Sequence, residues 1–230
     1  MCRGKDICDV LGADPGKWSK TCPLPLPGYF EKALVNFSYS VLSLAQGKLD
    51  EALDFLKLCD SDLVGQFFIE HGQQSAYFRV TNRKEIDKKN LLVKAVNKTH
   101  RLIPSIENEV FIRDSYRCRY CQMRIVEKNV FMEYSRIVGS ESFSVERENH
   151  KRNGLTLGLR GVADHVEPYA SGGETDLDNL VTSCYSCNFG KAGYTLEQLG
   201  IEDPRVRPPI ADSWQGLTEH LPVLQGIKRI

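Results

Sequence analysis

The chain has 230 residues, 41% of them hydrophobic and 26% charged, which is the composition of a globular protein that folds in water. No apolar run approaches the roughly 18 residues that a membrane helix needs, and the segment MCRGKDICDV lacks the apolar centre of a secretory signal. These features favour a cytoplasmic protein with no membrane partner, whose eight cysteines are mostly reduced.

Charge is unevenly spread along the chain, although the formal net charge is zero. Residues 79–160 carry 18 basic and 10 acidic side chains, whereas both flanking segments are acidic. A basic middle third is typical of a surface that binds a polyanion. A solvated helix face such as RKEIDKK explains the same excess, so charge alone does not decide between the two.

Three helices are predicted in the first third of the chain. Apolar residues recur at helical spacing over 29–46, and 49–58 predicts a second helix. A third helix is expected to begin at a cap formed by Asp60 or Ser61 and to end at Gly72. These helices would make a small helical N-terminal unit.

Further along the chain the predicted elements are mixed. A basic, helix-prone stretch covers 83–101, and the segment 122–160 contains two strand-like runs, NVFMEY and SRIVG. The residues from 201 onward hold several prolines and one Trp, so they are expected to pack over the surface of the preceding module. Together these patterns predict an α+β protein.

Four of the eight cysteines form two CxxC pairs, Cys118 with Cys121 and Cys184 with Cys187. Two such pairs complete a tetrahedral zinc site, and in a reducing compartment they favour structural zinc over a redox motif. The 62 residues between the pairs exceed the usual zinc-ribbon gap, so the clamp must enclose something else. The remaining cysteines are expected to be ordinary thiols rather than a second zinc site: Cys2, Cys8, Cys22 and Cys59.

The segment enclosed by the cysteines reads GVADHVEPYASGG over 161–173. An acid and an imidazole stand side by side at Asp164 and His165, and Asn179 and Asn188 follow. Taken singly, these residues are more often a surface pair, a turn residue and a helix cap. In this order, with the two CxxC pairs around them, they indicate a functional site.

The stretches RDSYRCRYC and ADHVEPYASGGETDLDNLVTSCYSCNFGK resemble the HNH, or His-Me finger, endonuclease family. The resemblance covers roughly residues 110–195. Asn188 stands where the family's third His is usual, and the gap before Asp164 is longer than in compact members. The resemblance implies a ββα-metal module of two strands and one helix, here stapled by zinc.

The resemblance also implies a division of the chain into three parts. Residues 1–100 would form the mainly helical N-terminal unit, which would recognise the target or a partner protein. Residues 101–200 would form the HNH nuclease module, and 201–230 a C-terminal tail packed on it.

The chemistry of phosphodiester hydrolysis suggests roles for these residues. A neutral imidazole, with an ordinary pKa of about 6.5, suits a general base, the role expected for His165. A hard divalent ion, magnesium or manganese, would bind oxygens of Asp164 and Asn188. Because neighbours on a strand point to opposite faces, Asp164 and His165 can face one phosphate only if the strand bends. The resemblance implies that Asn179 fixes the loop carrying His165, and that cleavage leaves a 5′-phosphate.

Basic side chains beside these motifs are candidates for binding the nucleic acid. Lys191 follows Asn188 by three residues on the predicted helix, so a contact between its ammonium and a phosphate oxygen is expected. Arginines crowd the first CxxC pair, and Arg113 and Arg119 are the candidates to reach phosphates. Tyr120 is expected to pack beside the zinc.

Three functions stay open from the sequence. The preferred one is metal-dependent hydrolysis of DNA, as used in restriction, homing, phage packaging and phage defence, with no small-molecule cofactor. A zinc-stabilised module that binds nucleic acid without catalysis is the first alternative, because Asn188 is a weaker ligand than His. The second alternative is an RNase.

Overall fold

The computed structural model describes residues 7–72, 75–82 and 104–228. The predicted helix within 83–101 and the thiol of Cys2 lie outside the described residues. Within the described ranges, no helix is both long and apolar enough to cross a membrane.

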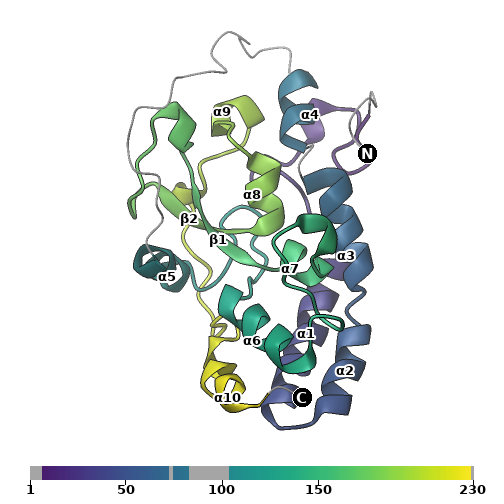
Figure 1. The fold of residues 1–230 in the computed structure, drawn as a ribbon. Coiled ribbons are helices and arrows are strands. Elements are labelled where there is room, and N and C mark those ends of the chain that lie inside the picture. The colour runs from purple at the N-terminus through teal and green to yellow at the C-terminus, as the bar shows by residue number, and fades with distance from the viewer. Residues whose placement is uncertain (1–6, 73–74, 83–103, 229–230) are drawn as a thin grey trace.

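The N-terminal helices follow the sequence pattern closely. Helices α1 (Tyr29–Ala45) and α2 (Leu49–Lys57) lie side by side, as Figure 1 shows. Helix α3 (Ser61–Phe67) begins after Asp60, whose side chain makes no capping hydrogen bond, and continues as a π-helical turn over Phe68–Gly72. The third predicted helix therefore ends where expected, at Gly72, but changes its hydrogen-bonding pattern on the way.

The strand prediction within 122–160 is wrong, because NVFMEYSRIV forms helix α6 (Lys128–Val138). Val130, Tyr134 and Ile137 are buried at helical spacing, so the run has a single apolar face rather than an alternating one. Short β-branched and aromatic runs match either element when read locally, and here burial on one face determined the helix.

The N-terminal helices share one hydrophobic core with α6 and with the C-terminal segment. Phe37 of α1 stacks on Phe131 of α6, with ring centroids 5.2 Å apart, and Phe143 packs against both. Leu224 of helix α10 (Leu221–Gly226) joins the same buried cluster. The helices of the predicted N-terminal unit thus pack directly on residues of the predicted nuclease module, and the boundary drawn at residue 100 lies outside the described residues.

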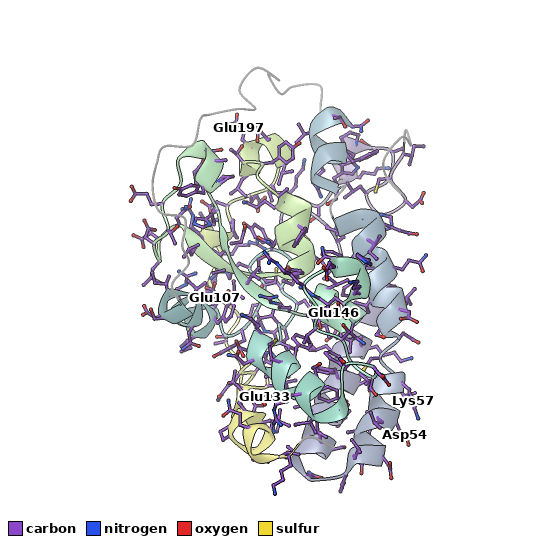
Figure 2. All side chains as sticks on the ribbon, viewed as in Figure 1. Asp54, Lys57, Glu107, Glu133, Glu146 and Glu197 are labelled. Carbon is purple, nitrogen blue, oxygen red and sulfur yellow. The ribbon has the colours of Figure 1, made fainter. Side chains whose placement is uncertain are left out.

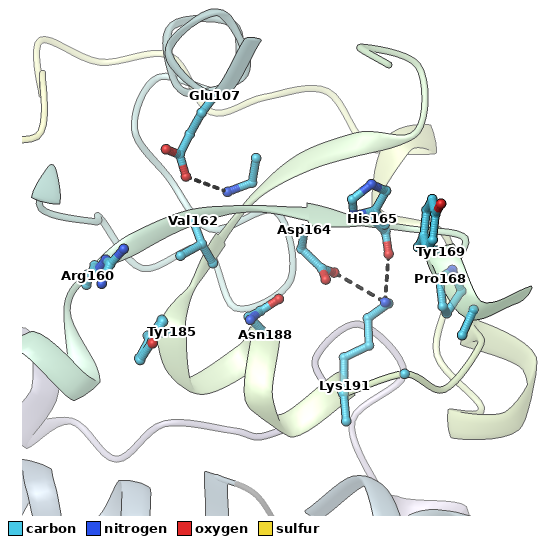
Figure 3. A pocket seen from close by; sticks show the side chains of 14 residues that line it. Glu107, Arg160, Val162, Asp164, His165, Pro168, Tyr169, Tyr185, Asn188 and Lys191 are labelled. Atoms are coloured by element: carbon cyan, nitrogen blue, oxygen red, sulfur yellow. Dashed lines mark hydrogen bonds and ion pairs between the residues drawn. The ribbon is translucent and has the colours of Figure 1, made fainter. Parts of the chain in front are cut away.

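A two-stranded antiparallel sheet lies at the centre of the second half of the chain. Strands β1 (Gly161–His165) and β2 (Leu180–Cys184) pair in register, with Gly161 opposite Cys184 and His165 opposite Leu180. Helix α8 (Tyr185–Lys191) starts directly after β2, and helix α5 (Pro104–Arg113) packs on the other side of the sheet (Figures 1 and 3). This confirms the α+β class and the two-strand-plus-helix arrangement.

The remaining elements are short. They are helices α4 (Ser75–Asn82), α7 (Gly154–Gly158) and α9 (Leu196–Leu199), and 3₁₀ turns at Pro15–Lys17, Asn149–Lys151, Tyr169–Ser171, Pro204–Val206 and Thr218–His220.

Candidate active site and metal centre

The four cysteines of the two CxxC pairs meet in one cluster, with their sulfur atoms all within 4.8 Å of one another. The Sγ atoms of Cys121 and Cys184 are 3.8 Å apart. Zn–S bonds of about 2.3 Å in a tetrahedron require sulfurs about 3.8 Å apart. The cluster therefore has the donors and the spacing of a structural zinc site, as the sequence predicts.

Local backbone structure prepares both pairs for a metal. Cys118 and Cys121 lie in a tight turn closed by the bond from the Gln122 amide to the Cys118 carbonyl, and Gln122 takes a left-handed φ of 65°. Cys184 is the N-cap of α8, and its Sγ accepts a hydrogen bond from the Cys187 amide at 3.4 Å. Burial raises the pKa of both Cys184 and Cys187 well above the ordinary value, so a bound metal would have to displace their protons.

A fifth thiol, that of Cys22, joins the cluster. Its Sγ lies 3.6 Å from the Sγ of Cys187, and the residue is only 5% exposed. Hydrogen bonds from Cys121 and Cys187 lower the pKa of Cys22 to about 5, and those from Cys118, Cys184 and Cys187 lower that of Cys121 to about 6. Cys22 thus ties the N-terminal segment to the zinc-type cluster, a role that its isolated position in the sequence did not reveal.

An open cavity of about 600 Å³ surrounds the end of β1. Asp164, His165, Asn188 and Lys191 all line it, and Pro168 and Tyr169 extend it around the end of the strand (Figure 3). Of the residues predicted to act in catalysis or to bind the catalytic metal, Asp164, His165 and Asn188 thus lie around one cavity, whereas Asn179 is not among its lining residues.

Asp164 is 6% exposed, and one of its two carboxylate oxygens has two partners. Oδ2 accepts a hydrogen bond of 2.7 Å from the Tyr120 hydroxyl and lies 3.4 Å from Nζ of Lys191. Burial raises the pKa of Asp164 above its ordinary value, and the Lys191 ammonium and the Tyr120 hydroxyl oppose that rise. Burial also raises the pKa of Tyr120 well above its ordinary value, so this hydroxyl stays protonated and donates.

The other side-chain oxygen of Asp164, Oδ1, has no bonding partner among the described residues. The side-chain amide of Asn188 likewise makes no bond with a described residue, and Figure 3 shows it on the same side of β1 as the Asp164 carboxylate. A carboxylate oxygen and an amide oxygen at one cavity are donors that magnesium and manganese accept. The donor set therefore fits a hard divalent ion with open positions for water and phosphate.

The ring of His165 leaves β1 on the opposite side from the Asp164 carboxylate (Figure 3). The expected bend between the two residues is absent, because β1 stays paired with β2 in regular register up to His165. Both residues still border the same cavity, since His165 is the last residue of the strand and the cavity extends around this end. Nε2 of His165 lies 2.8 Å from Oγ1 of Thr175, which orients the imidazole.

Asn179 holds the two ends of the loop that contains Thr175. Its Oδ1 accepts from the Glu167 amide at 2.8 Å, and its Nδ2 donates to the carbonyls of Glu167 and Glu174 at 3.0 and 2.8 Å. A Cβ at Gly173 would lie 2.0 Å from the Glu167 carbonyl oxygen, so only glycine fits beneath this loop. These are the backbone hydrogen bonds that the sequence analysis expected of Asn179, while its part in catalysis stays a prediction.

Lys191 does not occupy the position expected of a phosphate contact. Its side chain is 1% exposed, and Nζ donates to the His165 carbonyl at 2.7 Å in addition to facing Asp164. The ammonium lies in the interior because a buried carboxylate and a carbonyl at the end of the strand both require a partner. The contacts of Lys191 are thus with the side chain of Asp164 and the backbone carbonyl of His165.

The arginines expected to reach phosphates are engaged by the protein itself. Arg113 and Arg119 both bind the fully buried carboxylate of Asp114, and Arg113 also donates to carbonyls of Leu177 and Leu180. Arg119 is 4% exposed and donates to carbonyls of the C-terminal segment. Asp114 in turn accepts from the Thr182 amide of β2, so the network secures the hairpin. A contact between either arginine and a phosphate stays a prediction.

Three contacts around the site have no counterpart in the sequence patterns, and they involve Tyr120, Thr175 and Cys22. Tyr120 packs beside the cysteines as expected, but its hydroxyl reaches Asp164 across 44 residues of sequence. Thr175 lies ten residues after His165 in a loop. Neither contact has a spacing signal, because each depends on how the loops close in three dimensions.

The two strands and the helix that follows them form a ββα arrangement, and the four cysteines beside it could hold a metal ion such as zinc. The model of the HNH endonuclease family matches residues 160–192, which span β1, its loop, β2 and α8. The resemblance seen in the sequence is thereby confirmed, and it supports a nuclease-type function on nucleic acid. No curated protein and no solved structure matches the chain.

Proposed function

We propose that the protein is a metal-dependent endonuclease that hydrolyses phosphodiester bonds of DNA. The observation that carries this proposal is the set of groups around one cavity. They are Oδ1 of Asp164 and the amide of Asn188, neither of which bonds to a described residue, and the imidazole of His165. Asp164 and Asn188 would hold a magnesium or manganese ion, whose charge would stabilise the phosphate and the leaving oxygen.

His165 acts as general base in this proposal. It accepts a proton from a water molecule while the water oxygen forms a bond to phosphorus and the bond from phosphorus to the 3′ oxygen breaks. The product then carries a 5′-phosphate. Thr175 orients the imidazole, and Asn179 holds the loop of Thr175 in place.

Lys191 and Tyr120 are positioning residues. By bonding Oδ2 of Asp164, they direct Oδ1 towards the cavity, and Lys191 also holds the His165 carbonyl. A preorganised carboxylate needs little rearrangement when the substrate binds, which is where such sites gain most of their rate.

The test is cleavage of supercoiled plasmid with magnesium, manganese or neither. Wild-type protein is expected to nick DNA only with added metal, and His165→Ala to lose at least about 100-fold in rate. His220→Ala is the matched control, because His220 lies in a 3₁₀ turn beside Glu219 and lines no part of the cavity.

The outcomes separate the three candidate functions. Plasmid nicking that needs both metal and His165 supports the proposal. DNA binding without nicking under either metal overturns it in favour of a non-catalytic binding module. Cleavage of RNA with intact DNA overturns the choice of substrate and identifies an RNase.

A further inference from the structure

A second hollow, of about 220 Å³, adjoins the active-site cavity and shares Arg160 with it. It lies between α6, α7 and the loop before α7, so apart from Arg160 it falls outside the segment that matches the HNH family model. Half of its lining residues are basic and none is acidic. We call it the basic groove, lined by Lys128, Phe131, Met132, Val145, Arg147, Arg152, Thr156 and Arg160.

Arg160 stands at the junction of the two hollows, where Glu107 and Glu127 attract its charge but neither forms an ion pair with it. Its Nε is buried without a hydrogen-bond partner, and no carboxylate of the described residues forms an ion pair with it. The guanidinium carbon lies 5.2 Å from the ring centroid of Tyr185, which holds the group in place without neutralising it. A partly buried guanidinium of this kind readily forms an ion pair with an anion such as phosphate.

The rim of the groove adds further positive charge. The side chains of Lys128 and Arg147 are exposed and form no hydrogen bond or ion pair with any described residue. Arg152 donates to the carbonyls of Glu146 and Arg147, and its guanidinium carbon lies 5.9 Å from the Tyr185 ring. Carbonyl partners orient Arg152 but leave its charge in excess.

The floor of the groove is suited to the rest of a nucleotide. Met132 is 47% exposed and is not one of the buried residues of α6. Phe131 and Val145 line the groove together with it. Oγ1 of Thr156 is buried and has no hydrogen-bond partner within the described part of the chain. An apolar surface with one unused hydroxyl, surrounded by cations, matches a sugar or base with its phosphates.

We propose that the basic groove binds the DNA strand next to the bond that is cleaved, with Arg160 holding the phosphate between the two hollows. This inference rests on the proposed function and adds to it the path of the substrate. The strand passes from the cavity at Asp164 over Arg160 and continues along Lys128 and Arg147.

The test compares two double variants of equal charge change. Lys128→Gln with Arg147→Gln removes two groove charges, while Lys48→Gln with Lys57→Gln removes two charges from α2. Lys48 and Lys57 pair with Glu51 and Asp54, and Figure 2 shows Lys57 on the outer face of α2. Because all four lysine and arginine side chains are on the surface, circular dichroism should show both proteins folded.

Binding is measured by fluorescence anisotropy with a labelled DNA duplex, without added magnesium or manganese, over a series of salt concentrations. The groove variant is expected to bind about tenfold more weakly at about 0.15 M salt, and its log–log salt slope to fall by about 0.9 for each lost phosphate contact. In plasmid cleavage the loss should fall on KM rather than on kcat. The α2 variant should match wild type.

Failure of this inference and failure of the proposed function are distinguishable. If wild type cleaves DNA and the groove variant matches the α2 variant in affinity, salt slope and KM, the groove assignment is overturned and the nuclease proposal stands. If no protein cleaves but the groove variant binds DNA more weakly, the groove is supported and catalysis is not. Weaker binding of a matched RNA with unchanged DNA binding also overturns the assignment to DNA.

Discussion

The hydroxyl of Tyr120 donates a hydrogen bond of 2.7 Å to Oδ2 of Asp164. Tyr120 lies between Cys118 and Cys121, so a residue of the cysteine turn directly contacts the carboxylate of the active-site cavity. Both residues are almost completely buried, where a hydrogen bond to a carboxylate is strong and its loss is costly. The geometry of Asp164 therefore depends on the cysteine cluster remaining folded.

Replacing Tyr120 by Phe removes this hydrogen bond and keeps the ring. We expect kcat for plasmid nicking to fall about tenfold, equivalent to about 1.4 kcal/mol of barrier, because Asp164 is less firmly oriented. Half-maximal activity should also need more manganese. Tyr39→Phe, at a half-exposed position on α1, is the control. A metal requirement and rate equal to wild type would show that Lys191 alone orients Asp164.

Thr175 should matter through its hydroxyl and not through its volume. Thr175→Val has nearly the same shape but cannot bond Nε2 of His165, so the imidazole loses its orientation. We expect kcat to fall about tenfold. Thr175→Ser keeps the hydroxyl and should recover most of the rate, whereas equal loss in both variants contradicts a role for the hydroxyl.

The zinc-type cluster and the active site should respond differently to mutation. Cys184→Ser removes one of four metal ligands, so bound zinc and the melting temperature should both fall. His165→Ala should leave both near wild type. Zinc content is measured by atomic absorption and stability by thermal unfolding. A Cys184→Ser protein with full zinc and unchanged melting temperature refutes the structural role of the cluster.

Cys22 provides a sharper version of the same experiment. It is as close to Cys187 as a zinc ligand would be, at 3.6 Å, but four thiolates already complete a tetrahedral site. Cys22→Ser is therefore expected to keep its zinc and lose only some stability. Loss of zinc from Cys22→Ser together with retention by Cys118→Ser would reassign the ligand set.

Asp212 should make the free energy of unfolding depend on pH in acidic solution. Burial raises its pKa, but hydrogen bonds from Arg124 and Arg117 outweigh this and hold the pKa at about 2. Since the pKa in the unfolded chain is about 3.9, the contribution of Asp212 is fully present above that pH and lost as pH falls towards 2. Asp212→Asn should lower the urea midpoint by a constant amount from pH 8 to 5, with the difference narrowing below about pH 4. A pH-independent difference contradicts this origin.

Local pattern determined the helices α1 and α2, because each has an apolar face long enough to be recognised without knowledge of its partner. It also predicted the metal-type cysteines, since a CxxC turn brings two sulfurs together by itself. The ββα order was implied by the resemblance to the HNH family and not by local pattern. The same reasoning failed for α6, where a short apolar run fits a strand or a helix until its packing partner is known.

The sequence by itself determined which residues form the candidate site: the acid, the imidazole, the two asparagines and the four thiols. Only the tertiary structure decided how each is oriented. It turned Lys191 and Arg119 towards buried partners and placed the Tyr120 hydroxyl on Asp164. It also left Arg160, beside the cavity, with no ion pair to any described residue. The physical reason is that buried charges and hydroxyls take the nearest partner in space. The bonds of Lys191 to His165, Tyr120 to Asp164 and Thr182 to Asp114 span 26 to 68 positions, a separation that has no signature in a linear pattern.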